Sequence, residues 1–383
     1  MKEAILNPRG LKKALSGGLW FRKEDFLKIP PFAPGEPGLL LTPHGQFWGI
    51  AYFNPKSLIT ARLLSREKRP PDREFFKKRL KQCLEQRKGL YPQEEAFRLV
   101  HGEGDLLPGL TIDLYHQVAV IQLSTAGMER LKPYLLEALK LLLPLKGVIL
   151  KNNFPARKEE GLPLYTEALG VSEGFEVTID DLKFFVDPFE GQKTGFFLDQ
   201  RENRRKICRY VQGKTVLDLF SYTGAFSLYA AQAGAAKVLA VDRSEKALEM
   251  AERNASLNRL SGKITLIKDE VEHFLTYAPE AEVIILDPPA LIKKKKAYEK
   301  GKHRYRRLIQ MSLQRLTKGG ILLACSCSQF LPLEDLLKLC REEGTKLGRE
   351  MQLLEIGLQA PDHPVYLPMP GTLYLKALFL RVI

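Results

Sequence analysis

The chain has 383 residues, of which 45% are hydrophobic and 27% are charged, and its formal net charge is +14. This length exceeds one ordinary hydrophobic core, so we expect a globular protein of two or three domains. No apolar run reaches the ~20 residues of a membrane span, and the first residues lack a secretory-signal pattern, which together indicate a cytoplasmic protein.

The first predicted domain covers residues 1–75 and is a small β-barrel. Short β-like runs, such as "FWGIAYF" (47–53) and "SLITARLLS" (57–65), are separated by turns rich in Pro and Gly. Residues 1–80 hold 16 Lys/Arg against 7 Asp/Glu. Such a basic surplus is typical of proteins that bind a polyanion, so we expect a nucleic acid as the partner.

A second predicted domain covers residues 76–185. It opens with a basic linker helix and continues as strand, strand, helix, strand and hairpin, which is a mixed α+β unit. The helix is predicted from Met128 to Leu142, and the hairpin within "FEVTIDDLKFFVDP" (175–188).

The third predicted domain, residues 186–383, is of the α/β class. Apolar runs rich in Val, Ile and Leu alternate with helical stretches, which predicts a parallel, doubly wound, Rossmann-like sheet. The five expected strands are 215–220, 237–242, 264–269, 283–289 and 319–326.

Acidic residues stand at the ends of four successive strands, namely Asp218, Asp242, Asp269 with Glu270, and Asp287. Ligands of such sheets bind at the carboxyl ends of the strands. The acid of the second strand suits a ribose, and that of the third suits an adenine amino group. Gly224 allows close backbone approach, but one glycine disfavours a dinucleotide. The ordered set resembles the class I S-adenosylmethionine-dependent methyltransferases; the alternative is that these acids cap helices.

The fifth strand carries Cys325 and Cys327 to the same edge. The five cysteines are odd in number and scattered, which argues against disulfides, and Cys-x-Cys alone argues against zinc. If the strand persists, both thiols share one face. A thiolate that adds to C6 of a pyrimidine makes C5 nucleophilic, so we expect covalent catalysis by Cys327, while the role of Cys325 stays open.

Asp287 would face the same base, where a carboxyl group near N3 stabilises charge in the adduct. Amino-group methyltransferases carry an aromatic residue after Asp-Pro-Pro. Ala290 stands there instead, which disfavours that chemistry.

Over essentially its full length, the chain resembles the PUA-domain 23S rRNA (cytosine-C5)-methyltransferases of the RlmI type. The resemblance rests on the ordered stretches "YFNPKSLITARLLS" (52–65), "RLVHGEGDLLPGLTIDLY" (98–115), "GQKTGFFLDQRENR" (191–204), "DLFSYTGAFS" (217–226), "LDPPAL" (286–291), "SCS" (326–328) and "APDHPV" (360–365).

This resemblance implies that residues 1–75 are a PUA-like RNA-binding barrel and that 23S rRNA or the large ribosomal subunit is the partner. It implies Cys327 as nucleophile and S-adenosylmethionine as cofactor. The implied cofactor-binding residues are Phe197, Gln200, Arg201, Asp218, Ser221, Gly224, Ala225, Phe226, Asp242, Asp269, Glu270 and Asp287. Arg201 would pair with the methionine carboxylate.

The chain departs from the family pattern at two positions. Ile309 replaces an Asn that often follows the Tyr of a Y-K-x-x-N segment, and Ala290 replaces the second Cys of related enzymes. Product release must then use another group, with Cys325, His363 or a water as candidates.

The segment "LIKKKKAYEKGKHRYRRL" (291–308) is rich in basic and aromatic residues, a mixture that suits RNA phosphates and exposed bases. Two alternatives stay open, namely methylation of another RNA atom and a non-catalytic RNA-binding assembly factor. The modified cytosine, the base that removes the C5 proton and a homodimer are also open.

Overall fold

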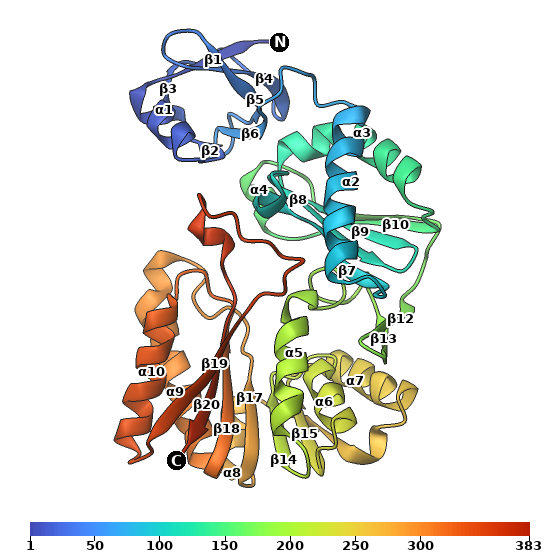
Figure 1. The fold of residues 1–383 in the computed structure, drawn as a ribbon, viewed down its shortest axis with the longest axis vertical. Helices are drawn as coiled ribbons and strands as arrows, with labels where there is room; N and C mark the ends of the chain where they lie inside the picture. Colours follow the sequence, from blue (N-terminus) through green and yellow to red (C-terminus); the bar gives the residue numbers. More distant parts are fainter. The chain divides into compact units, whose positions relative to one another are not determined.

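The computed structural model describes all residues 1–383. The chain folds into two compact units, each built from several separate stretches (Figure 1). The first unit comprises Met1–Val177, Val186–Leu198 and Pro361–Thr372, and the second comprises Thr178–Phe185, Asp199–Ala360 and Leu373–Ile383. The division at residues 75 and 185 therefore stays a prediction.

The N-terminal part of the first unit is a six-stranded sheet with the order β2-β6-β5-β4-β1-β3. Helix α1 (Pro8–Leu15) begins after Asn7, whose side chain accepts a hydrogen bond from the Gly10 amide at 2.8 Å. The predicted β-runs are present, whereas α1 was not predicted. The strands are β1 (Glu3–Leu6), β2 (Trp20–Phe21), β3 (Phe26–Lys28), β4 (Glu36–Leu41), β5 (Phe47–Phe53) and β6 (Ala61–Ser65).

A second sheet of the first unit has the order β11-β10-β9-β8-β7 and packs with the helices α2 (Arg73–Leu90) and α3 (Ala126–Leu142) around one apolar core. The predicted linker helix and the helix ending at Leu142 are confirmed. Strand β11 was not predicted. The remaining elements are β7 (Ala96–His101), β8 (Leu110–Tyr115), β9 (Val118–Leu123), β10 (Gly147–Asn152), α4 (Ala156–Glu159) and β11 (Tyr165–Leu169).

The predicted hairpin is present as the strands β12 (Phe175–Ile179) and β13 (Leu182–Val186), which form a two-stranded sheet. Its turn residues Asp180 and Asp181 have φ of 51° and 66°. Two consecutive left-handed residues match the twist of a tight hairpin, and Asp tolerates that conformation better than most residues.

The second unit contains a seven-stranded sheet with the order β16-β15-β14-β17-β18-β20-β19. The first five strands are parallel, as predicted, whereas β20 runs antiparallel to both of its neighbours. The last two strands were not predicted. The strands are β14 (Thr215–Leu219), β15 (Lys237–Asp242), β16 (Ile264–Lys268), β17 (Ala281–Leu286), β18 (Leu316–Ser326), β19 (Met351–Leu358) and β20 (Lys376–Val382).

Helices cover both faces of this sheet. Figure 1 shows α5, α6 and α7 on one side and α9 and α10 on the other. This doubly wound arrangement brings the carboxyl ends of β14 to β18 to one edge. The helices are α5 (Arg201–Ile207), α6 (Ala225–Gln232), α7 (Glu245–Leu257), α8 (Val271–Tyr277), α9 (Tyr298–Arg315) and α10 (Leu333–Lys346).

Candidate active site

The loop between β14 and α6 has a strained backbone. Phe220, Tyr222 and Gly224 have φ of 64°, 50° and 75°, so three of five consecutive residues are left-handed. Residues other than glycine rarely adopt this conformation, and it is concentrated at functional sites. The Ser221 hydroxyl is buried in this loop without a hydrogen-bond partner. The loop therefore offers an unsatisfied polar group beside a glycine that permits close approach.

Two of the predicted acids support this loop. Asp242 is the last residue of β15, as expected, and its carboxylate accepts backbone hydrogen bonds from Tyr222 at 3.0 Å and Ser244 at 2.9 Å. Asp218 lies inside β14 rather than after it, and it accepts a hydrogen bond from the Ser227 hydroxyl at 2.6 Å. Burial raises the pKa of Asp218 to about 7.

Asp269 follows β16 at the expected position, but helix α8 already occupies its carboxylate. The Tyr277 hydroxyl and a His273 ring nitrogen each lie 2.7 Å from this carboxylate, as does the Glu270 amide. The Tyr277 hydrogen bond is the main cause of the lowered pKa of Asp269. Glu270 is exposed and lies 3.3 Å from the guanidinium of Arg243. The adenine contact stays a prediction.

Asp287 follows β17 and lies beside Gln200, whose side-chain amide donates a hydrogen bond to it at 3.0 Å. Asn203 in turn donates to the Gln200 side chain at 2.6 Å. The register pairs Leu286 with Ala324, which brings Cys325 next to Asp287. Burial raises the pKa of Cys325 well above its ordinary value, and the negative charge of Asp287 adds to this effect. Cys325 is therefore a neutral, fully buried thiol.

The condition under which both thiols would share one face of the strand is not met, because β18 ends at Ser326 and Cys327 lies one residue beyond it. The thiols differ in exposure, since Cys325 is buried and Cys327 is only half-buried. We call residues 326–328 the SCS loop. The Tyr305 hydroxyl on α9 lies 2.9 Å from the Ser326 hydroxyl and 3.1 Å from the Ser328 hydroxyl, so both serines are held in place.

The remaining predicted cofactor residues are mostly buried. Arg201 is 1% exposed and lies 3.8 Å from the Asp180 carboxylate, so it is no surface arginine and already has an acidic neighbour. Phe226 packs 6.0 Å from the guanidinium of the buried Arg204, and Ala225 is the first residue of α6. Phe197 belongs to the first unit, where the Lys193 ammonium lies 4.3 Å over its ring.

The basic segment 291–308 divides into two parts. Lys293–Lys296 are exposed and precede α9, with Lys295 and Lys296 in a short 3-10 helix, and an RNA contact requires such exposure. Tyr305 is 1% exposed, so its expected stacking on RNA bases is wrong. Burial raises its pKa to about 12. Tyr298 is also engaged, because its hydroxyl donates a hydrogen bond to Asp335.

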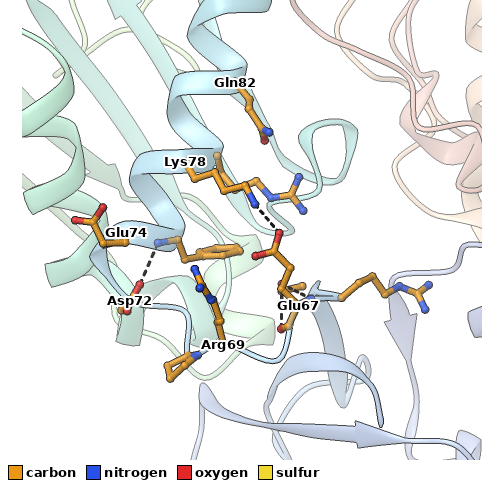
Figure 2. A pocket seen from close by; sticks show the side chains of 11 residues that line it. Glu67, Arg69, Asp72, Glu74, Lys78 and Gln82 are labelled. Atoms are coloured by element: carbon orange, nitrogen blue, oxygen red, sulfur yellow. Dashed lines mark hydrogen bonds and ion pairs between the residues drawn. The ribbon is translucent and has the colours of Figure 1, made fainter. Parts of the chain in front are cut away.

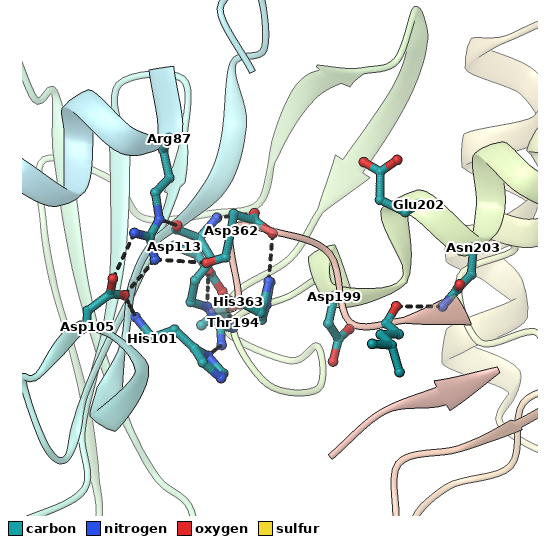
Figure 3. A network of polar contacts seen from close by, with 12 residues as sticks. Arg87, His101, Asp105, Asp113, Thr194, Asp199, Glu202, Asn203, Asp362 and His363 are labelled. Atoms are coloured by element: carbon teal, nitrogen blue, oxygen red, sulfur yellow. Dashed lines mark hydrogen bonds and ion pairs between the residues drawn. The ribbon is translucent and has the colours of Figure 1, made fainter. Parts of the chain in front are cut away.

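The first unit contains a buried polar network around the "APDHPV" stretch (Figure 3). Arg87 on α2 forms a bidentate ion pair with Asp105, at 2.8 and 2.6 Å, and donates to the Asp362 carbonyl at 3.0 Å. The Asp362 carboxylate accepts from the Arg98 amide at 2.8 Å and lies 2.7 Å from a His363 ring nitrogen. His363 thus belongs to the packing of the first unit.

A pocket of about 510 Å³ lies where β6 leads into α2 in the first unit (Figure 2). The Arg66 guanidinium lies 4.1 Å over the ring of Trp48, and Lys78 is paired with Glu67 at 2.6 Å. Arginine beside an aromatic ring suits phosphate and base contacts. The charged residues that line the pocket are Arg66, Glu67, Arg69, Asp72, Glu74, Lys78 and Arg79.

Two further features concern the whole chain. None of its helices is long and apolar enough to cross a membrane. No group of three or more His, Cys, Asp and Glu side chains is arranged to hold a metal ion.

Comparison with known proteins agrees with this geometry. The model of the S-adenosylmethionine-dependent methyltransferase family matches residues 164–381, and that of the PUA-like domain matches residues 4–66. A solved methyltransferase structure in complex with SAH superposes with a TM-score of 0.87 and 23% identity over 100% of both chains, and this shows a common fold.

The names of similar proteins indicate a narrower family within these methyltransferases. Ribosomal RNA large subunit methyltransferase I from Tolumonas auensis is 38% identical over 94% of this chain and 93% of its own. The protein of that description from Pseudoalteromonas atlantica is 34% identical over 89% of each chain. The chain therefore belongs to the S-adenosylmethionine-dependent methyltransferases, in the family of ribosomal RNA large subunit methyltransferase I.

The residues present fit this cofactor. The unsatisfied Ser221 hydroxyl, the left-handed Gly224 and the carboxylate of Asp242 gather around one loop at the edge where such sheets bind ligands. Sequence reasoning had singled out these three residues but missed the strain at Phe220 and Tyr222, which only the backbone reveals.

Proposed function

We propose that this protein methylates C5 of a cytosine in the RNA of the large ribosomal subunit, with Cys327 as the nucleophile. The observation that carries the proposal is the contrast between the two thiols. Cys325 is fully buried and neutral, whereas Cys327 is half-buried in the SCS loop, one residue beyond the end of β18.

The chemistry of C5 explains why a thiol is needed. Carbon C5 of cytosine is a weak nucleophile, and a Cys327 thiolate that bonds to C6 turns the ring into an enamine. Bound S-adenosylmethionine supplies the electrophilic methyl group. Loss of the C5 proton to a base and breakage of the C6–S bond then restore the aromatic ring and the free thiolate. The base that takes this proton is unassigned.

Asp287 is the group that we place against the pyrimidine. Its carboxylate is fixed by the hydrogen bond from Gln200, which Asn203 orients in turn. A carboxyl group held in this way can hydrogen-bond to N3 and stabilise the charge of the adduct. Gln200 was expected to bind the cofactor, and that role stays a prediction; its hydrogen bond supports a positioning role toward Asp287 as part of this proposal.

The RNA substrate is supported by the family relatives and by charge. Relatives that cover most of the chain are named as ribosomal RNA large subunit methyltransferases. The exposed Lys293–Lys296 follow Pro289 of the "LDPPAL" motif by a few residues, so RNA phosphates would meet them near the reacting base. The homodimer left open from the sequence stays a prediction.

The test is methyl transfer from labelled S-adenosylmethionine to large-subunit RNA, followed by analysis of the modified nucleosides. We expect 5-methylcytosine from the wild type and from Cys325→Ala, and none from Cys327→Ala. RNA with 5-fluorocytosine at the target should trap a covalent complex with the wild type and with Cys325→Ala, but not with Cys327→Ala. A Cys327→Ala variant that still forms 5-methylcytosine would refute the mechanism, and a different methylated nucleoside would refute the target atom. Absence of any transfer by a wild type that binds the cofactor would favour an assembly factor.

A further inference from the structure

Lys376 is a buried lysine at the start of the apolar strand β20. It is 4% exposed, and the antiparallel register pairs it with Ser326, the last residue of β18. Its ammonium donates a hydrogen bond to the Ser328 carbonyl at 2.8 Å. The Lys376 side chain therefore contacts Ser328, which follows Cys327 in the sequence, while the Lys376 backbone pairs with Ser326, which precedes Cys327.

No carboxylate lies within ion-pair distance of this ammonium. A buried charge without a counter-ion is costly, and proteins rarely retain one without a purpose. Burial lowers the pKa of Lys376 to about 8, and a negative charge on Cys327 is what acts against this effect. The Lys376 ammonium and the Cys327 thiol are therefore close enough for a charge on one to act on the other.

Asp287, Tyr305 and Cys325 are titratable groups near the SCS loop. Burial raises the pKa of Tyr305 on α9 and of Cys325 on β18, and negative charge on Asp287 and Cys327 adds to both shifts. Negative charge from Asp287 disfavours a nearby thiolate. A cation beside Cys327 favours the ionised thiol, and the buried Lys376 ammonium contacts the SCS loop at the residue that follows Cys327.

We propose that Lys376 is the counter-ion of the Cys327 thiolate, so that it keeps the nucleophile ionised before a pyrimidine binds. The thiol proton passes to solvent, the ammonium keeps its own protons, and the pair persists until sulfur bonds to C6. Lys376 is a positioning residue, since it acts through Cys327. This inference rests on the proposed function for its purpose, but the thiolate can be measured without RNA.

Tyr305 provides a comparison, because it holds the same loop without a charge. Its hydroxyl contacts Ser326 and Ser328, so Tyr305→Phe loosens the loop but leaves the ammonium in place. Lys376→Met removes the charge and keeps an apolar chain of similar length, and Lys376→Arg keeps the charge. Cys208, half-buried in the same unit, is an internal reference thiol.

The experiment measures the rate of Cys327 alkylation by iodoacetamide in the full chain, resolved by peptide mass spectrometry, between about pH 5.5 and 9.5. For Lys376→Met we expect a rate about 10- to 100-fold lower near neutral pH, and a profile midpoint moved upward by about one to two pH units. Lys376→Arg and Tyr305→Phe should keep the wild-type midpoint, and Cys208 should keep its profile in every variant.

An unchanged Cys327 midpoint in Lys376→Met would overturn the inference. So would an equal shift in Tyr305→Phe, because loop position rather than charge would then control the thiol. The outcome of the alkylation experiment can be distinguished from the outcome of the test of the proposed function. A shifted midpoint without 5-methylcytosine in the transfer assay refutes the function and keeps the ion pair, whereas 5-methylcytosine with an unshifted midpoint does the reverse.

Discussion

Helix α2 contributes to one buried and one exposed ion pair, and breaking each pair should lower the free energy of unfolding by very different amounts. Arg87 and Asp105 are bidentate, with side chains only 2% and 3% exposed. Asp105 also accepts a hydrogen bond from the His101 amide at 2.6 Å. Asp105→Ala leaves a buried guanidinium without its carboxylate, and we expect a loss of about 3–5 kcal/mol in the free energy of unfolding of the first unit.

The matched control lies on the same helix. Lys81 and Glu85 form a pair at 3.8 Å with both side chains 65% exposed, so Glu85→Ala should cost less than about 0.5 kcal/mol. A third variant, Arg87→Met combined with Asp105→Leu, replaces the buried charges by apolar groups. It should be less destabilised than Asp105→Ala alone, because no charge is left unpaired.

The assay is urea unfolding followed by tryptophan fluorescence. The chain has two tryptophans, Trp20 and Trp48, and both lie in the first unit, so the signal reports on that unit alone. A loss below about 1 kcal/mol for Asp105→Ala, or a loss equal to that of Glu85→Ala, would refute the reasoning that burial makes this pair indispensable.

Three further changes test the second unit. Burial raises the Asp218 pKa from 3.8 to about 7, so the folded state keeps this proton and loses stability as the pH rises through that window. Free energies of unfolding from thermal melts should show that Asp218→Asn stabilises the protein by an amount that grows from about pH 4 to 7, by up to about 4 kcal/mol. A stabilisation that does not change with pH would contradict this assignment. Gly224→Ala forces a Cβ onto a φ of 75° and to 3.1 Å from Ala251, so calorimetry should show weaker S-adenosylmethionine binding, and unchanged affinity would contradict the role of the loop. Glutamine at Lys293–Lys296 should lower the slope of log affinity for RNA against log salt by about 3 and leave cofactor affinity unchanged; an unchanged slope would place the RNA contacts elsewhere.

The parallel part of the sheet was predictable because its signals are local. Buried runs of Val, Ile and Leu mark β14 to β18, acids stand at or near the ends of the first four, and the residue that follows such a strand lies at the ligand edge. Asp242 and Asp287 were placed correctly on this reasoning alone. Asp218 lies one residue before the last residue of β14 instead of after the strand, since a carboxylate inside a strand looks the same in sequence as one that follows it.

The rest depends on contacts between distant residues. The lysine that opens β20 reads as a solvent-exposed edge residue until the register with β18 is known. Strand β19 has mostly exposed or half-buried residues, so its apolar pattern is weak. Tyr305 could have been found, because it recurs with Leu308 and Ile309 at the spacing of a buried helix face. Its basic neighbours concealed that pattern.

The order in which the two units can form follows from the sequence separation within the buried network. Asp362 accepts hydrogen bonds from the Arg87 guanidinium and from the Arg98 backbone amide, and it lies 275 and 264 positions after them in the chain. At ~5–20 residues per second, a ribosome needs roughly 14–55 s to synthesise the intervening segment. During that time the Arg87 guanidinium and the Arg98 backbone amide must remain solvated or be paired by other groups. The first unit of a ribosomal RNA methyltransferase is thus begun early and completed among the last events of its own translation.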